Sequence, residues 1–358
     1  MKKKNTRLII SLLVVVALYV AGWALEQLNG SKSMVVTVLQ KGAVYALIAV
    51  SMNLLNGFTG LFSLGQAGFM LVGAYSYAIL TIPMEKRAAV YQYYDGGWVQ
   101  FTIGVLPALL IAGVVAALFA ALIGLPVLRL KGDYLAIATL GFAEIIRAIV
   151  QWDTIGPLTN GSNLLKTYPT LKNIMPGNTV LFTFIVVGIC IGLILLLINS
   201  TYGRAFKAIR DDEVAAEAMG INLFHHKQMA FVISSFFAGI GGALLAMYQG
   251  SLQANSFKSS MTYEILLIVV IGGLGSVSGS VMASFLFIAC SEWWLRFLDA
   301  ETVINDFKVP LLAPGFRMVV FAVVIMVVVL FFRKGIMGDR ELWELGARRG
   351  AKGGRKAK

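Results

Sequence analysis

The chain has 358 residues, of which 58% are hydrophobic and only 13% are charged, and its formal net charge is +12. A soluble domain carries roughly 25% charged residues, and a water-soluble globule of this length could not bury so much apolar surface. The composition therefore excludes a soluble enzyme, a disordered protein and an ordinary nucleic-acid-binding domain, and it indicates an all-α, polytopic membrane protein.

Many of the Lys and Arg residues lie near the two ends of the chain, and the stretches between are nearly uncharged. This distribution is typical of a membrane protein that keeps its basic segments on the cytoplasmic side, and it argues against nucleic acid as a partner. We expect the basic tail, residues 339–358, to lie in the cytoplasm close to anionic membrane lipid.

A membrane-spanning helix needs about 20 consecutive, largely apolar residues. The stretches that meet this requirement are, in chain order, 8–28, 35–55, 61–82, 98–125, 133–151, 178–198, 228–250, 263–298 and 316–332. The first follows a basic start and its apolar core is long, with no small-residue cleavage site that stands out. We interpret it as a first membrane span rather than a signal peptide.

The stretch 263–298 is too long for one helix across a hydrocarbon core of about 30 Å. Its middle, residues 272–279, reads GGLGSVSG, and glycine lets the backbone turn or lets helices approach closely. We expect either two passes or two re-entrant half-helices here. With two passes, the chain has about ten passes in total, and both ends and most Lys and Arg residues lie on the cytoplasmic side.

Two apolar stretches, 53–75 and 265–284, are broken by Gly and Ser where a continuous helix is expected. Paired interrupted segments indicate a transport path in transporters that are built from repeats. Close helix packing through small residues is the alternative. The candidate path residues are Asn53, Gly65, Gln66, Gly68, Glu144, Gly273, Gly275 and Ser276.

Glu144 and Arg147 lie within the predicted span 133–151, three residues apart. This spacing puts the two side chains on one face of a helix, where they can pair. Charged groups inside a membrane are costly, so we expect both to face protein or water and not lipid. The pair is either an element of a gate or path, or a structural pair near the outer interface.

The segment 200–226 lies between two predicted spans, but its pattern is too regular for a plain linker. Apolar residues recur at helical spacing, and Gly220 follows as a stop signal. The spacing predicts a short helix–turn–helix, basic first and acidic second. Such a mixed-charge amphipathic segment suits docking into a groove of a soluble partner, whereas the alternative is a loop packed on its own membrane domain.

Within this segment, residues 216–220 read AEAMG, and they resemble the coupling loop of the integral subunits of ATP-binding-cassette (ABC) importers. The chain as a whole resembles the M-type permease subunit of branched-chain amino acid importers of that class. The resemblance spans roughly residues 53 to 338. It rests on stretches that follow one another in order, namely GLFSLGQAGFMLVGAY (60–75), LRLKGDYLAIATLGFAEIIR (128–147), GRAFKAIRDDEVAAEAMGIN (203–222), AFVISSFFAGIGGALLA (230–246), IGGLGSVSGSVMAS (271–284) and FRMVVFAVVIMVVVLFFRKGIMG (316–338).

The resemblance implies a permease domain over residues 1–338 that has no ATPase activity of its own. It implies as partners a second, similar permease subunit, two cytoplasmic ATP-binding subunits and an extracytoplasmic solute-binding protein, all at a bacterial plasma (inner) membrane. The implied ATPase-coupling residues are Arg204, Arg210, Asp211, Asp212, Glu213, Glu217 and Gly220. The sequence agrees on one independent point, since it contains no Gly-x4-Gly-Lys-[Ser/Thr] motif for ATP.

No cofactor, metal site or catalytic constellation is expected. The two cysteines lie in apolar runs, and the two histidines are adjacent, so that their side chains point apart on a helix. The loop 159–165 departs from the family pattern by lacking a second glycine. This loop should face outward, so the departure bears on the contact with the binding protein.

The implied substrates are leucine, isoleucine and valine, although related permeases carry urea, amides or other amino acids. A secondary transporter driven by an ion gradient is a further alternative, and Glu144 is the candidate ion or proton site for it. That alternative leaves the ordered segment 203–222 without a role. An intramembrane enzyme is a third hypothesis, and no constellation of residues supports it.

Overall fold

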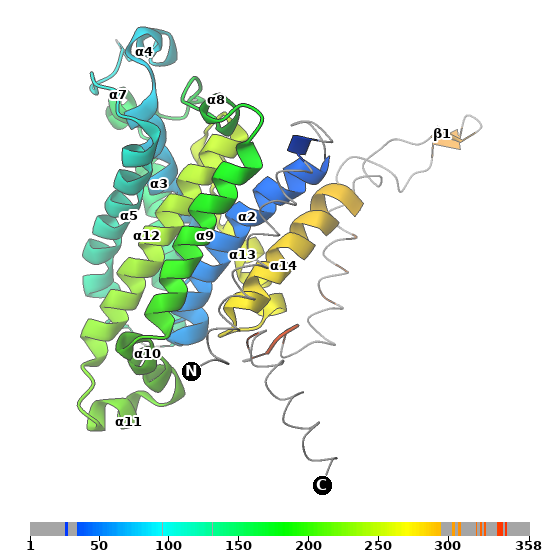
Figure 1. Ribbon diagram of the computed structural model, residues 1–358. Coiled ribbons are helices and arrows are strands. Elements are labelled where there is room, and N and C mark those ends of the chain that lie inside the picture. The colour runs from blue at the N-terminus through cyan, green and yellow to red at the C-terminus, as the bar shows by residue number, and fades with distance from the viewer. Residues whose placement is uncertain are drawn as a thin grey trace, which may run out of the picture.

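The computed structural model describes residues 26–27, 34–94, 96–130, 132–294, 303–304, 307–308, 320, 323, 326, 335–338 and 341. Their fold is a bundle of long helices, with α4, α7 and α8 at one end and α10 and α11 at the opposite end (Figure 1). Within the described residues, regular β structure is confined to two paired two-residue strands, β1 (Val303–Ile304) and β2 (Phe307–Lys308). The predicted all-α class is confirmed.

The first half of the bundle contains α2 (Met34–Asn53), α3 (Gln66–Thr81), α4 (Met84–Val90), α5 (Val105–Val127), α6 (Asp133–Gln151) and α7 (Gly156–Thr159). The second half contains α8 (Leu171–Ile174), α9 (Thr179–Ile198), α10 (Thr201–Asp211), α11 (Glu213–Ala218), α12 (Leu223–Gln249), α13 (Ser259–Gly272) and α14 (Val277–Ala289). Two π-helical turns, Leu54–Phe58 and Cys290–Trp294, extend α2 and α14, and 3-10 turns lie at Asp153–Ile155 and Ala254–Ser256.

Among the described residues, four helical stretches are long and apolar enough to cross a membrane. They are Met34–Phe58, Val105–Val127, Thr179–Ile198 and Leu223–Gln249. A fifth candidate is α6 together with Asp153–Thr159, which are bent by 61° relative to each other. These five match predicted spans, and α6 has the predicted bounds 133–151. The predicted spans 8–28 and 316–332 lie almost wholly outside the described residues, and the count of about ten passes stays a prediction.

The predicted span 61–82 is helical only in α3, which has 16 residues. The residues before it, 59–65, are not helical. Gly60 has φ +75, a conformation that ends the preceding helix and that glycine adopts without strain. The interruption predicted within 53–75 is therefore present, and it shortens this span.

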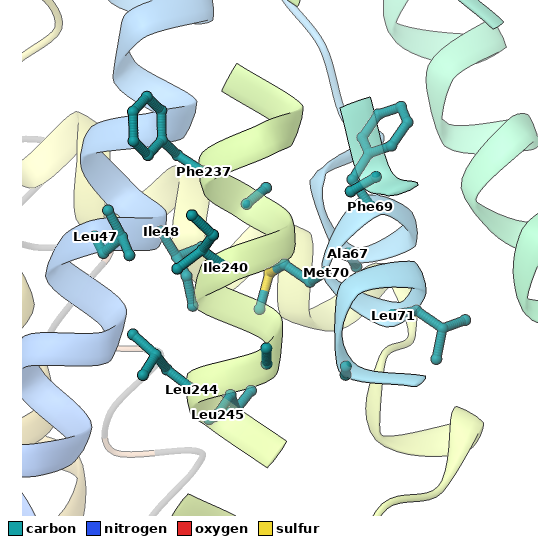
Figure 2. Close-up of a cluster of buried hydrophobic side chains, with 14 of the residues drawn as sticks. Leu47, Ile48, Ala67, Phe69, Met70, Leu71, Phe237, Ile240, Leu244 and Leu245 are labelled. Atoms are coloured by element: carbon teal, nitrogen blue, oxygen red, sulfur yellow. The ribbon is translucent and has the colours of Figure 1, made fainter. Parts of the chain in front are cut away.

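The hydrophobic core lies around α12, which packs against α2, α3 and α5. Figure 2 shows α12 between α2 and α3, with Ile240 and Leu244 directed at the α2 side and Met70 approaching from α3. Small residues allow the close approach of α3 and α12. A Cβ added to Gly73 would lie 2.1 Å from the Gly239 carbonyl oxygen, so no larger residue fits between these backbones.

The long stretch 263–298 is divided into α13 and α14 by a turn in which Gly273 has φ +111 and Gly275 has φ +88. The two helices touch at Gly272, where an added Cβ would lie 2.6 Å from the Gly279 carbonyl carbon. The turn contacts the carboxyl end of α2 through Asn53, and Glu292, beyond α14, binds Lys41 near the amino end of α2. Consequently α14 runs antiparallel to α2.

Candidate coupling surface and translocation route

The segment 200–226 forms two short helices, α10 and α11, as its pattern predicts. The Asp212 carboxylate caps α11 by accepting hydrogen bonds from the Val214 and Ala215 backbone N–H groups at 2.9 and 3.0 Å. Gly220 has φ +85 and ends α11, and the following Ile221 N–H bonds back to the Ala216 carbonyl at 3.1 Å. This is the glycine-dependent helix ending expected from the sequence.

One side of α10 is anchored on the membrane domain. Phe206 and Ile209 are buried, and the Lys207 ammonium lies 5.6 Å from the centre of the Phe58 ring. Arg210 donates a hydrogen bond to the Gly57 carbonyl oxygen at 3.2 Å and pairs with Asp211 at 3.1 Å. Arg210 and Lys207 of α10 thus contact the π-helical turn that ends α2.

The other side of α10 and α11 is open. Val214 is 77% exposed and Met219 is 83% exposed, which are high values for apolar side chains. Between α10 and the residues that follow α11, up to the start of α12, lies a hollow of about 740 Å³, lined by Thr201, Tyr202, Arg204, Ala205, Ala208, Gly220, Ile221 and His226. The segment is thus packed on its own domain through one face and presents a second, partly apolar face outward.

The charged residues predicted for coupling are divided between these two faces. Arg204, Asp211, Asp212 and Glu217 are exposed. Glu213 forms an ion pair with Lys227 of α12 at 2.7 Å, and this pair ties α11 to the membrane domain.

Four of the predicted path residues meet at one junction between the two interrupted segments. The fully buried Asn53 amide donates to the Ser276 carbonyl at 2.9 Å and to the Ser280 hydroxyl at 2.8 Å, and its oxygen accepts from the Gly275 N–H at 2.9 Å. Gly273 completes the turn, with its carbonyl 3.4 Å from the same amide. One side chain thus pairs with several of the backbone groups that the break in the helix leaves free.

Three other predicted path residues lie around the start of α3, away from this junction. The buried Gln66 amide donates to the Ser51 hydroxyl at 2.7 Å. Gly65 and Gly68 face α6, since Cβ atoms added there would lie 3.0 Å from the Thr139 carbonyl oxygen and 2.8 Å from the Ala143 Cα. The close-packing interpretation fits these two glycines directly.

Glu144 and Arg147 pair as their spacing predicts, with Arg147 Nη2 2.5 Å from Glu144 Oε2. The Ser259 hydroxyl at the start of α13 donates to the other carboxylate oxygen. Arg147 also reaches the Asn255 amide oxygen at 3.4 Å. The pair lies inside α6, since Glu144 is about 10 Å along the helix axis from Gln151 at a rise of about 1.5 Å per residue.

Two contacts made by buried or half-buried glutamates are not evident from the sequence. Lys41 binds Glu292, 251 residues further along the chain. The Glu26 carboxylate, which is 2% exposed, caps α9 by accepting from the Thr179 and Val180 N–H groups at 2.9 and 3.0 Å. No local pattern marks such distant partners. Among the described residues, no three His, Cys, Asp or Glu side chains gather closely enough to hold a metal ion.

The loop 159–165, predicted to face outward, lies at the end of the bundle opposite α10 and α11. Asn160 and Gly161 both have positive φ, 64° and 58°. The loop borders a hollow of about 380 Å³ that is also lined by Ala89, Val90, Gln92, Tyr93, Lys166 and Thr167. Beside it, the Tyr91 hydroxyl donates to the Leu158 carbonyl at 3.0 Å, and burial raises the pKa of Tyr91 to about 12, so this hydroxyl stays protonated at neutral pH.

Comparison with known proteins identifies a family. A family model described as "Branched-chain amino acid transport system / permease component" matches residues 34–329. The high-affinity branched-chain amino acid transport system permease protein LivM of Escherichia coli K12 is 34% identical over 277 residues, which is 70% of this chain and 61% of that protein. The match thus spans less than two thirds of that relative's length.

The LivH permease protein of the same E. coli system is 23% identical over 316 residues, covering 84% of this chain and 93% of LivH. A probable branched-chain amino acid transport permease protein, LivM of Methanocaldococcus jannaschii, is 24% identical over 270 residues, covering 68% of this chain and 76% of that protein. No solved structure matches the chain.

Proposed function

The chain belongs to the family of permease components of branched-chain amino acid transport systems, and we propose that it is the transmembrane permease subunit of an ABC importer for leucine, isoleucine and valine. Family membership makes the chain a multi-pass membrane transport protein and not an enzyme. The observation that carries the proposal is the α10–α11 segment, which is anchored to the end of α2 through Arg210 and Gly57 and exposes its other face.

In this proposal, α10 and α11 dock on a cytoplasmic ATPase. The docking residues are the charged Arg204, Asp211, Asp212 and Glu217 and the apolar Val214 and Met219. The two apolar side chains are exposed to water in the isolated chain, which is unfavourable, and a partner would bury them. Arg210, Glu213 and Gly220 hold the two helices in position. ATP-driven movement of α10 then acts on the turn Leu54–Phe58 and, through Asn53, on the turn between α13 and α14.

The orientation follows from the coupling role, since the end that bears α10 and α11 must face the ATPases in the cytoplasm of a bacterium. The described residues near the carboxyl terminus support this orientation. Ile336 donates to the Ile271 carbonyl at 2.7 Å, and the Glu341 carboxylate accepts from the Val277 N–H at 2.8 Å. These contacts lie at the junction with Asn53, so we propose that the tail is cytoplasmic, as is the amino terminus after about ten passes.

The proposed route for substrate passes beside the two interrupted segments. The junction formed by Asn53, Gly273, Gly275 and Ser276 closes its cytoplasmic part, and we place Gln66 further along it. Gly65 and Gly68 serve the close packing of α3 on α6, and Glu144 pairs with Arg147 on α6. A path of small and neutral polar groups suffices for this role, because an extracytoplasmic solute-binding protein selects the substrate beforehand. Urea, amides or other amino acids are the alternative substrates.

The proposed partners are a second, similar permease subunit, two ATP-binding subunits and the solute-binding protein. The similarity of the chain to both LivM and LivH, two permease proteins of one named system in E. coli, supports a pair of different permeases. We expect this chain to occupy the LivM position.

The test is Glu217→Lys in the complete complex, reconstituted in lipid vesicles with ATP inside. We expect leucine uptake to fall while the ATPases continue to hydrolyse ATP, because the reversed charge disturbs the docking face. The matched control is Glu85→Lys, the same change on the exposed surface of α4 at the opposite end. Unchanged uptake with Glu217→Lys would remove the coupling role, and uptake driven by an ion gradient without ATP would favour the secondary transporter.

A further inference from the structure

The outward faces of the helices in the bundle differ in chemistry. Neither α5 nor α9 contains Asp, Glu, Lys or Arg. The large side chains that these two helices expose are hydrocarbon, and they include Leu110, Leu118, Leu122, Ile189 and Leu196, each between 58% and 72% exposed. Such faces suit direct contact with lipid.

The outward face of α6 is different. Tyr134, Ile137 and Ile145 are exposed along it, at 73%, 66% and 51%. Next to Ile145 on α6, Glu144 and Arg147 keep 36% and 23% of their side chains exposed in the isolated chain. The ion pair is therefore partly exposed on the surface of the isolated chain, and both of its residues lie within the helical segment of α6.

A second helix continues this face. Ser259, the first residue of α13, binds Glu144, and the Gln151 amide donates to Asn255 at 3.1 Å. Tyr263 follows Ser259 by one helical turn and is 49% exposed. We call the surface formed by Ile137, Gly141, Glu144, Ile145, Arg147 and Tyr263 the α6–α13 face.

Lipid is a poor cover for the α6–α13 face, because charged and amide groups in the hydrocarbon region are costly unless protein or water surrounds them. Another helix is a better cover. Nothing lies within 4 Å of a Cβ added to Gly141, so the backbone of a neighbouring helix can come close at this point.

We propose that the α6–α13 face is the surface on which the second, non-identical permease subunit docks, with the Glu144–Arg147 pair covered by that subunit. This inference rests on the proposed function, since it concerns the arrangement of the two permeases within the importer. It assigns α5 and α9 to the lipid. A non-identical occupant is favoured over a second copy of this chain because the chain is similar to both LivM and LivH, two permease proteins of one named system.

The test is site-specific photo-crosslinking in the complete complex in native membranes. The variants Ile145→p-benzoylphenylalanine and Tyr263→p-benzoylphenylalanine place the probe on the α6–α13 face. The variants Leu118→p-benzoylphenylalanine and Ile189→p-benzoylphenylalanine are matched controls on α5 and α9. Each product is identified by mass spectrometry, and leucine uptake is measured for every variant.

We expect both α6–α13 positions to yield a covalent product with the second permease, and the α5 and α9 positions to yield none above background. A permease product from Leu118 or Ile189, a product with a second copy of this chain, or products only within one chain from both α6–α13 positions would overturn the inference. Failure of the proposed function is seen separately, as absence of ATP-dependent leucine uptake by the wild-type complex whatever the crosslinks show.

Discussion

At the scale of single residues, the junction between the interrupted segments depends on one amide. Asn53 satisfies an N–H group, a carbonyl and a hydroxyl of the turn that separates α13 from α14, and it is buried. Neither Asp nor Leu can replace it, since the site needs both a donor and an acceptor. This is why a polar residue lies at the buried carboxyl end of α2.

Asn53→Ala should therefore destabilise the protein and slow transport. It leaves buried polar groups without partners, at a cost of about 1–3 kcal/mol. The measurements are thermal unfolding of the purified complex and leucine uptake by vesicles. Asn173→Ala, at an exposed position on α8, is the control, and equal unfolding temperatures for the two variants would contradict this account of Asn53.

The same junction also requires a residue without a side chain at position 57. A Cβ at this position would lie 2.4 Å from the Gly275 backbone nitrogen and 1.8 Å from Asn53 Oδ1. Gly57→Ala should cost about 1–3 kcal/mol through overpacking and should reduce uptake.

The matched control for this substitution is Gly192→Ala on α9, where nothing lies within 4 Å of the added Cβ. Alanine is the better helix former, by roughly 1 kcal/mol, so the control should unfold at the same temperature as the wild type or slightly higher. A Gly57→Ala variant as stable and active as Gly192→Ala would contradict the claim that the junction has no room for a side chain at position 57.

At the scale of elements, α11 is short enough to depend on its ends. With only six residues, it makes few internal hydrogen bonds and relies on Asp212 at one end and Gly220 at the other. Asp212 is also a candidate for contact with an ATPase, so its two roles need to be separated.

Asp212→Ala removes the cap and should destabilise α11 by about 1 kcal/mol, lowering leucine uptake relative to ATP hydrolysis. Asp212→Asn keeps a capping oxygen but removes the charge. If capping is the role of Asp212, the Asn variant regains uptake. Equal loss in both variants would instead assign Asp212 to an electrostatic contact with the partner.

The elements also show how far the sequence predicts the fold. The bounds of α6 follow from its apolar length, and the division of 263–298 follows from glycine. The break within 53–75 follows from its Gly and Ser residues, but its position does not, so the predicted span 61–82 begins before α3, which starts at Gln66. The site is predicted in part, since the spacing of Glu144 and Arg147 is local, whereas the pairing of Lys41 with Glu292 depends on helix packing across 251 residues.

At the scale of the whole molecule, a chain of contacts connects the α10–α11 surface to the break between α13 and α14. The face of α10 and α11 lies at one end, Arg210 joins it to Gly57, and Asn53 joins the end of α2 to the α13–α14 turn. The Glu144–Arg147 pair lies elsewhere, on the α6–α13 face, where we place the second permease.

The pair should behave as a unit in assembly. Glu144→Gln or Arg147→Met alone leaves an unpaired charge inside the membrane, at a cost of at least about 2.5 kcal/mol, and should reduce recovery of the two permeases together. The double variant restores neutrality, and breaking a buried pair is worse than replacing it, so it should recover more assembled complex than either single variant. Co-purification yields check this, and additive losses would contradict it.

The most direct measurement is uptake of labelled leucine into vesicles that contain this chain, the second permease and the ATP-binding subunits, with the solute-binding protein added outside. The account predicts uptake that requires both ATP and the binding protein, and no comparable uptake of urea. Uptake of urea alone would contradict the proposed substrate, and leucine uptake that needs an ion gradient and no ATP would contradict the importer itself.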